Sequence, residues 1–217
     1  MHSLVDDLMH EAHGVLSVGA SYTYGEYVLP HIIASLRKSH KLIKPSITIG
    51  NTREIAELVL RHTIDVGIIE GDFKHDNLTI EPFAEDRMYV VCSSAHRFAK
   101  QNKASISELK EETWIIREPG SGTREATERL FAAFQSRPGD IMEFGSTQII
   151  LESVEAGMGI SLLSNWAIRK EVSLGSMKII EIDDGPILRY FSIVTQASTF
   201  RTKATEVFLD TLRNSKV

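Results

Sequence analysis

The sequence predicts an α/β fold with two lobes, each built on a parallel sheet flanked by helices. From Val15 onward, short β-branched runs alternate with stretches whose apolar residues recur at helical spacing. Parallel strands need a crossover, and a helix of ten to fifteen residues supplies one. The same alternation starts again near residue 113. This restart indicates a second lobe of the same kind.

The first half contains three predicted strands, at 15–21, 46–51 and 65–71. A helix is expected after each of the first two strands, because apolar residues recur there at spacings of three to five and one. The expected buried faces consist of Tyr27, Val28, Ile32, Ile33 and Leu36 in the first helix, and of Ile55, Leu58, Val59 and His62 in the second.

The second half repeats the pattern with predicted strands at 113–120, 140–146 and 159–164. Each of these strands precedes a helical stretch. The first of the three helices is expected to bury Ala126, Leu130, Ala133 and Phe134.

Two further strands connect the halves. Residues 86–100 predict a strand that runs into a loop, and 187–196 predict a strand before a final helix at 202–215. If the first strand leaves lobe one and the second returns to it, the last helix packs on lobe one. We therefore expect lobe one to comprise 14–92 plus 194–217, and lobe two to comprise 93–193.

Composition excludes several classes of protein. A chain of 217 residues with 42% hydrophobic residues can bury a substantial core. A formal net charge of −5 without a long basic run argues against nucleic-acid binding by this chain alone. The single cysteine, Cys92, excludes an internal disulfide and fits a reducing compartment. No apolar run reaches membrane-span length and the acidic N-terminus is unlike a signal peptide, so a cytoplasmic location without membrane attachment is expected.

Polar residues follow four predicted strands at the point where a helix begins. Helix N-termini present unpaired N–H groups and the positive end of the helix dipole, which suit a small anion. In "REPGSGTRE", Gly120 and Gly122 allow a tight turn and close backbone approach. Ordinary helix capping is the alternative reading of each such residue. The four corners contain Ser21 and Thr23; Asn51 and Thr52; Ser121 and Thr123; and Ser146, Thr147 and Gln148.

Motifs for catalysis and for cofactor or metal binding are missing. The "GSGTR" stretch matches neither a P-loop nor a dinucleotide fingerprint, and no nucleophile elbow occurs. His10 and His13 lack a third metal ligand at useful spacing. Glu70 and Asp72 could act as a paired acid and base, although strand-end carboxylates usually cap turns. We expect no catalytic residue, no cofactor and no metal site, with Cys92 as a buried apolar residue.

Five segments in order resemble the effector-binding domain of LysR-type transcriptional regulators. They are "VLSVGASYTYGEYVLPHII", "GNTREIAELVLRHTIDVGIIEG", "YVVCSSAHRFA", "IIREPGSGTRE" and "ILESVEAGMGISLLS". Within the family, "REPGSGTR" resembles the branch that includes regulators of sulfur assimilation and of carbon fixation. The resemblance implies a periplasmic-binding-protein-like fold of two Rossmann-like lobes, joined by two crossover strands, with an inducer between the lobes.

The resemblance also implies which residues bind and which partners exist. Residues 1–13 look like a remnant of the family's linker helix behind an added start, and the N-terminal winged helix-turn-helix is expected to be absent from this chain. DNA would then be bound only through that missing domain, and the full protein would be a homodimer or tetramer. The expected ligand is a small anionic metabolite or inorganic anion. Its implied contacts are Ser21, Thr23, Asn51, Thr52, Ser121, Gly122, Thr123, Thr147 and Gln148.

Two other functions remain open at this point. A free-standing solute-binding protein would share the fold, and a transferase or lyase could use the same scaffold. The enzyme would need a base or a cofactor lysine, whereas the four corners offer hydroxyls and amides and contain no lysine. Arg124 is the nearest strong charge, and its spacing favours a pair with Glu128 at i,i+4.

Overall fold

Two compact units make up the chain in the computed structural model, which describes residues 12–101, 103–133, 137–182, 185–197 and 201–215. Unit 1 comprises Met1–Ile69, Phe73–Ala84 and Ser192–Val217, and unit 2 comprises Glu70–Asp72 and Glu85–Phe191. Most of the expected linker-helix remnant, including His10, lies outside the described residues. The expected lobe boundaries at 92/93 and 193/194 stay a prediction.

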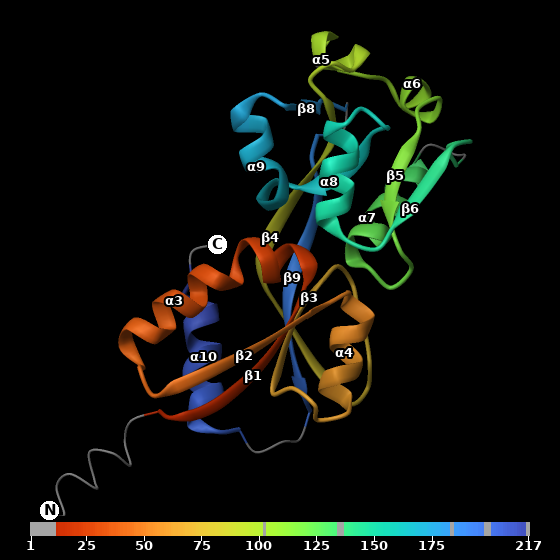
Figure 1. Cartoon of the computed structure of the whole chain (residues 1–217). Helices are drawn as coiled ribbons and strands as arrows, with labels where there is room; N and C mark the ends of the chain where they lie inside the picture. Colours follow the sequence, from red (N-terminus) through yellow and green to blue (C-terminus); the bar gives the residue numbers. More distant parts are fainter. Residues whose placement is uncertain (1–11, 102, 134–136, 183–184, 198–200, 216–217) are drawn as a thin grey trace, which may run out of the picture. The chain divides into compact units, whose positions relative to one another are not determined.

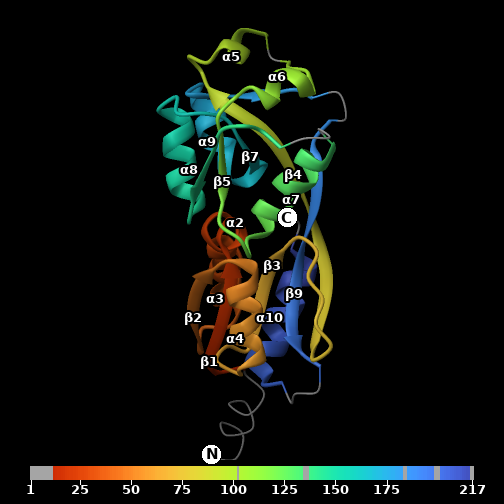
Figure 2. The same ribbon diagram turned by 90° about the vertical axis from the view of Figure 1, so that its right-hand side faces the viewer.

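The sheet of unit 1 begins with three parallel strands. Its order is β2-β1-β3, where β1 is Gly14–Ser21, β2 is Ile43–Gly50 and β3 is Val66–Glu70. Next to β3 lie β9 (Ile187–Gln196) and then β4 (Leu78–Ser93), as Figure 2 shows. Both β4 and β9 contribute residues to both units.

Four helices cover the unit 1 sheet. They are α2 (Tyr22–Tyr27), α3 (Leu29–Ser39), α4 (Thr52–Leu60) and α10 (Lys203–Asn214). Helices α3 and α10 pack together on one side of β1 and β2, and α4 lies on the other side (Figure 1). Successive right-handed crossovers in opposite directions along a sheet produce this arrangement.

Two details of unit 1 differ from the sequence prediction. The single helix expected after β1 is two helices, because Val28 ends α2 and Pro30 occupies the first turn of α3, where its missing N–H has no helical partner to lose. His62 is wrong as a buried residue. Helix α4 ends at Leu60, and His62 is exposed with a left-handed φ of 56°.

Unit 2 combines a parallel strand pair with antiparallel pairing to β4. Strands β5 (Trp114–Arg117) and β6 (Ile141–Phe144) are parallel. Strands β7 (Ser161–Ser164) and β8 (Met177–Ile180) pair antiparallel with β4. Its helices are α5 (Arg97–Gln101), α6 (Ile106–Lys110), α7 (Gly122–Ala133), α8 (Thr147–Glu155) and α9 (Asn165–Leu174).

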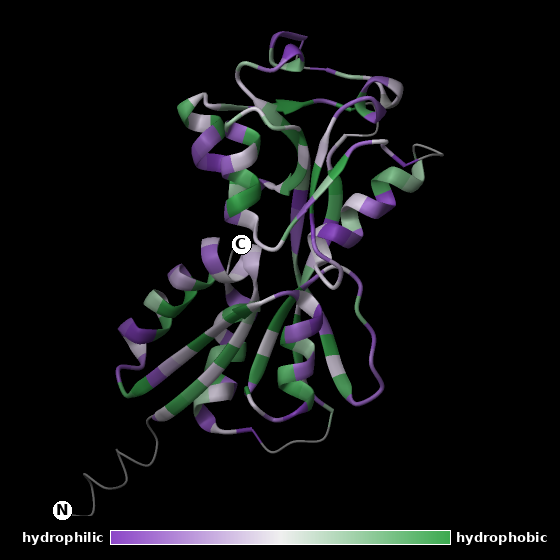
Figure 3. Cartoon of the chain, turned by 45° about the vertical axis from the view of Figure 1, so that its right-hand side comes forward, coloured by the Kyte–Doolittle hydropathy of each residue, from purple (hydrophilic) through white to green (hydrophobic). Residues whose placement is uncertain are grey.

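The core of unit 2 forms around Trp114, whose indole N–H donates to the Leu109 carbonyl at 2.8 Å. Phe131 packs edge-on against the Trp114 ring, with centroids 4.9 Å apart. The buried stripe of α7 therefore uses Phe131. Ala133 was wrongly expected to be buried and is exposed, and Phe134 lies outside the described residues. Figure 3 shows hydrophobic and hydrophilic residues on different sides of the helices, as expected for helices packed against sheets.

Three short elements were not predicted from the sequence. Helix α5 occupies part of the segment expected to be a loop, and α6 and β8 were not anticipated. Helices of five residues carry too little periodic signal to be distinguished from turns. Within the described residues, no helix combines the length and the apolar character needed to cross a membrane.

Candidate functional site

In unit 1, the strand register brings two of the predicted corners together. Ser21 at the end of β1 lies opposite Gly50 at the end of β2, which places Asn51 and Thr52 beside it. The hydroxyls of Ser21 and Thr52 are 3.3 Å apart and hydrogen-bonded. Ser21, Thr23 and Thr52 are all buried, at 5% exposure or less. We call these residues, with Asn51, the unit 1 half-site, a candidate site in which the buried hydroxyls are already held in place.

Capping explains only one of these unit 1 side chains. Asn51 accepts a hydrogen bond from the Glu54 N–H at 3.0 Å, and the Glu54 carboxylate accepts from the Asn51 N–H at 2.8 Å. This reciprocal pair is a capping box, which satisfies two donors at the start of α4. Ser21, by contrast, makes no side-chain capping bond to α2. Its burial at the strand end is therefore not explained by capping.

In unit 2, the corresponding corners meet at the ends of β5 and β6. Arg117 lies opposite Phe144 in the parallel register, so the starts of α7 and α8 are neighbours. Ser121, Thr123 and Thr147 are buried there. Ser146 caps α8 by accepting from the Ile149 N–H at 3.3 Å, which leaves Thr147 free of the capping role.

Gln148 lies apart from this group of buried residues. Its side chain is exposed and donates to Glu152 along α8 at 2.8 Å. Its contact with an effector stays a prediction.

Ser121, Thr123 and Thr147 form the second candidate, the unit 2 half-site, and a buried cation that was not predicted from the sequence lies beside Thr147. The guanidinium of Arg117 is 1% exposed and donates to the Thr147 hydroxyl at 3.1 Å. Two further donors contact the Glu118 carboxylate at 2.7 and 2.8 Å. A charged residue that ends the apolar strand "WIIR" is the signal that could have revealed it.

Arg124 makes the local pair that its spacing predicted. Its Nε donates to Glu128 at 2.7 Å, and its Nη1 donates to Glu143 at 2.9 Å and to the Arg117 carbonyl at 2.7 Å. These carboxylates raise the pKa of Arg124 despite opposing desolvation. Arg124 therefore joins α7 to β5 and β6 along the surface of unit 2.

Thr123 belongs to a buried ionic cluster that the sequence analysis also missed. Its hydroxyl accepts from Arg189 Nη1 at 2.9 Å and donates to Glu70 at 3.4 Å. Arg189 also pairs with Glu70 at 2.8 Å and with Asp86 at 2.7 Å. Asp86 in turn accepts from the Ser164 hydroxyl at 2.6 Å. Burial raises the pKa of Asp86, against the opposing effect of Arg189.

Gly122 has a packing role that involves the same cluster. A Cβ at this position would collide with the Glu70 carbonyl group, so only glycine allows this approach. Gly120 adopts a φ of 97°, which favours glycine in the preceding turn. Glu70 and Asp72 do not form the paired acid and base that the sequence allowed. Glu70 pairs with buried Arg189, whereas exposed Asp72 pairs with Arg129 at 3.0 Å.

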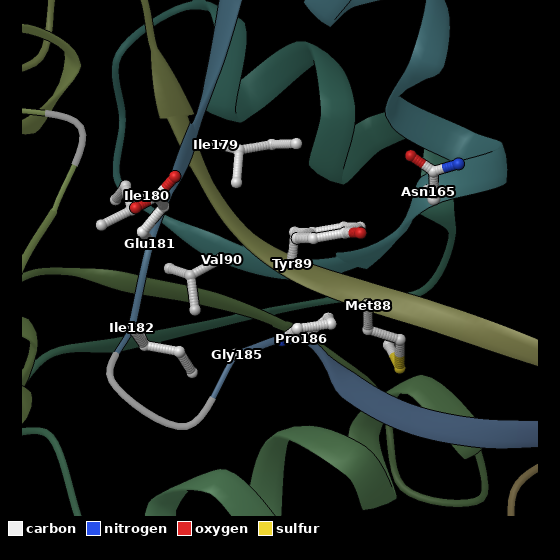
Figure 4. Close-up of a pocket in the computed structure, with 10 residues that line it drawn as sticks. All are labelled: Met88, Tyr89, Val90, Asn165, Ile179, Ile180, Glu181, Ile182, Gly185 and Pro186. Atoms are coloured by element: carbon white, nitrogen blue, oxygen red, sulfur yellow. The ribbon is translucent and has the colours of Figure 1, made fainter.

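The other candidates give no competing site in the described residues. Cys92 is buried, and desolvation raises the pKa of its thiol to about 11. No cluster of potential metal ligands occurs in the part of the chain that is described. A cavity of about 570 Å³ lies in unit 2 beside β4 and β8, and none of the predicted effector contacts lines it (Figure 4). Its lining residues include Tyr89, Asn165, Ile179 and Glu181.

Comparison with known protein families gives one match over nearly the whole chain. A family model described as the LysR substrate binding domain matches residues 10–216. The HTH-type transcriptional regulator CysL of Bacillus subtilis is 35% identical over 206 residues, which cover 95% of this chain and 69% of CysL. The HTH-type transcriptional activator CmpR of Synechocystis is 29% identical, over 98% of this chain and 69% of CmpR.

Solved structures agree with these matches. The regulatory domain of Synechocystis CcmR in complex with 2-PG has a TM-score of 0.83 and 27% identity, covering 93% of this chain and 96% of that domain. The effector binding domain of QuiR in complex with shikimate also has a TM-score of 0.83, covering 93% of this chain and 96% of that one. At 21% identity, the second likeness concerns the fold alone.

Proposed function

Since this chain belongs to the LysR family and is the effector-binding domain of a transcriptional regulator, we propose that it senses a small anion through two polar half-sites, one in each unit. It has the family's two-lobed, periplasmic-binding-protein-like fold. Its relatives are transcriptional regulators, so the chain is a ligand sensor and not an enzyme. Regulators of this family bind small-molecule effectors, and the anionic class is our proposal.

The observation that carries the anionic class is the contact between Arg117 and Thr147 at the start of α8. Arg117 places a desolvated guanidinium beside the buried Thr147 hydroxyl, at the helix N-terminus where the positive end of the α8 dipole lies. Desolvated charge and fixed donors together favour an anion over a neutral ligand. Glu118 neutralises Arg117 in part, so an incoming anion would compete for the same guanidinium.

The unit 1 half-site would add neutral donors for the same anion. Ser21, Thr23 and Thr52 contribute buried hydroxyls, and Asn51 lies beside them, with its side-chain oxygen capping α4. In unit 2, Ser121 and Thr123 stand at the first turn of α7, and Gly122 contributes only its backbone.

A thermal-shift and calorimetric screen tests the proposal. The panel contains sulfate, phosphate, 2-PG and shikimate, the last two because they occur with CcmR and QuiR. We expect at least one anion to stabilise the chain by mass action and to lose this effect in Arg117→Met. Arg169→Met, which removes an exposed arginine from α9, is the matched control and should bind as the parent does. Equal affinity in Arg117→Met would contradict the anion assignment.

We also propose that the chain forms a homodimer, as expected from the family resemblance. Strand β2 is the edge of the unit 1 sheet and exposes the side chain of Ile47, with Leu42 exposed just before it. Exposed apolar residues on an edge strand favour association with another chain unless another surface covers them. Sedimentation at high micromolar concentration should show a dimer, and Ile47→Lys should shift it toward monomer. A purely monomeric parent chain would refute this part of the proposal.

A further inference from the structure

We propose that Arg189 is a positioning residue for effector binding, which holds Thr123 and the first turn of α7 by joining them to Glu70 and Asp86. The inference rests on the proposed function, because α7 begins one of the two half-sites. It adds a connection from the first turn of α7 to three chain segments, because Glu70, Asp86 and Arg189 each lie close to a position where the chain passes from one unit to the other.

The sequence positions of the three ions form the first part of the argument. Glu70 is the first residue after the passage from unit 1 to unit 2, and Asp86 is the second residue after the later passage at 84/85. Arg189 is the third-last residue of unit 2 before the chain passes back to unit 1 at Ser192. All three side chains are buried within unit 2, at 2% exposure or less. Each is therefore a desolvated charge placed next to a passage between the units.

The geometry of the guanidinium forms the second part. Nε of Arg189 donates to Asp86 at 2.7 Å, and Nη1 contacts both Glu70 at 2.8 Å and the Thr123 hydroxyl at 2.9 Å. Arginine holds several acceptors in one plane through its rigid fork, which a lysine ammonium cannot reproduce. Thr123 is thus fixed by the same guanidinium that pairs with the two carboxylates.

Backbone contacts at the same place form the third part. The α7 N-terminus approaches Glu70 so closely that Gly122 has no room for a Cβ. The Gly71 N–H donates to the Tyr190 carbonyl at 3.1 Å, which joins two of the three segments directly. A displacement of the first turn of α7 would therefore disturb Glu70 and, through Arg189, the remaining two segments.

The chain contains a matched control for this cluster. Arg129 also projects from α7 and pairs with Asp72 in the same 70–72 segment, at 3.0 Å. Its side chain is 40% exposed, and its partner is 81% exposed. Exposed pairs constrain a structure weakly, because water and salt screen them. Arg129→Met thus removes a link between the same two elements without disturbing the buried cluster.

The test measures local amide exchange first, in the absence of any ligand. The readouts are the amides of Arg124 and Glu125 in α7, compared with the amides of Ile150 and Leu151 in α8. In Arg189→Lys and Thr123→Val, we expect the α7 amides to exchange about tenfold faster or more, with the α8 amides unchanged. Thr123→Ser keeps the hydroxyl and should restore the parent rate. Arg129→Met should leave both helices unchanged.

Anion binding is the second readout, with the members of the screening panel as probes. Arg189→Lys should weaken the binding of the tightest probe by about tenfold or more, whereas Arg129→Met should leave it unchanged. Equal exchange increases throughout unit 2, or no increase in α7, would overturn the positioning role. If no panel anion binds the parent chain, the proposed anionic effector fails, and the exchange readout still decides the role of Arg189.

Discussion

The proposed half-sites of the two units both lie where strands end and helices begin, but they differ in their electrostatics. In unit 1 the predicted contacts are neutral, and the neighbouring carboxylate of Glu54 is used in a capping box. In unit 2 the predicted contacts touch buried ions, because Thr147 contacts Arg117 and Thr123 contacts Arg189. Unit 1 can therefore offer an effector neutral hydrogen-bonding groups, whereas unit 2 also contains buried charges next to the predicted contacts.

The largest expected difference concerns stability after removal of a buried ion. Arg189→Met leaves two buried carboxylates without their guanidinium, which should cost about 3–5 kcal/mol of unfolding free energy. Arg213→Met breaks an exposed pair with Glu81 in unit 1 and should cost about 0–1 kcal/mol. Urea denaturation of both variants measures the contrast. Similar losses would mean that the unit 2 cluster is not energetically distinct.

The next effect concerns the glycine that brings α7 against Glu70. Gly122→Ala should destabilise the fold by about 1–3 kcal/mol, because backbone and not a flexible side chain blocks the added Cβ. Gly145→Ala is the control, since no atom lies within 4 Å of its added Cβ. Thermal unfolding compares the two. A neutral Gly122→Ala would show that α7 is not held tightly at this position.

A comparison within α7 follows, and it concerns binding. Thr123→Ala should weaken binding of the tightest panel anion by about 1–3 kcal/mol, because it removes the hydroxyl that joins the first turn of α7 to Arg189 and Glu70. Arg124→Ala should cost clearly less, because its guanidinium is occupied by Glu128 and Glu143. Calorimetry distinguishes the two variants. Unchanged affinity in Thr123→Ala with collapse in Arg124→Ala would identify Arg124 as the anchor.

The fold could be predicted from the sequence because it depends on periodic patterns. The alternation of β-branched runs with amphipathic stretches identified the α/β class, and the polar residues predicted at strand ends do lie where strands end and helices begin, while their contact with an effector stays a prediction. Short elements such as α6 escaped, since five residues cannot establish a period.

The ionic cluster could not be predicted in the same way, because it joins residues up to 119 positions apart, from Glu70 to Arg189. A partial signal was nevertheless present. Arg189 lies two residues from each of the apolar residues Ile187 and Phe191 in the same strand. Because residues two apart in a strand point to the same face of the sheet, the guanidinium is expected on the face that carries Ile187 and Phe191. Which carboxylates it meets depends on the strand order β9-β4, which the sequence pattern leaves open.

The smallest expected effect concerns Cys92 in unit 2. Burial raises the pKa of its thiol from 9.0 to about 11, so at pH 8 the folded chain holds a neutral, unreactive thiol. Because the unfolded thiol ionises at a lower pH than the folded one, the folded state loses stability as pH rises from 9.0 toward about 11. Below pH 9.0 the thiol is neutral in both states, and the contribution of Cys92 to stability is fully present. Thiol labelling at pH 8 should be slow when the chain is folded and fast in urea. Rapid labelling of the folded chain would contradict this burial.

Calorimetric titration of matched variants decides whether the proposed anion depends on residues of both half-sites. The titrant is the tightest anion of the panel, and the variants are Thr52→Val in unit 1, Thr147→Val in unit 2 and the control Arg169→Met. We expect weaker binding in both threonine variants, each by about 1–3 kcal/mol, with a larger loss in Thr147→Val because it also removes a partner of Arg117. Parent-like affinity in both threonine variants would show that the anion binds elsewhere.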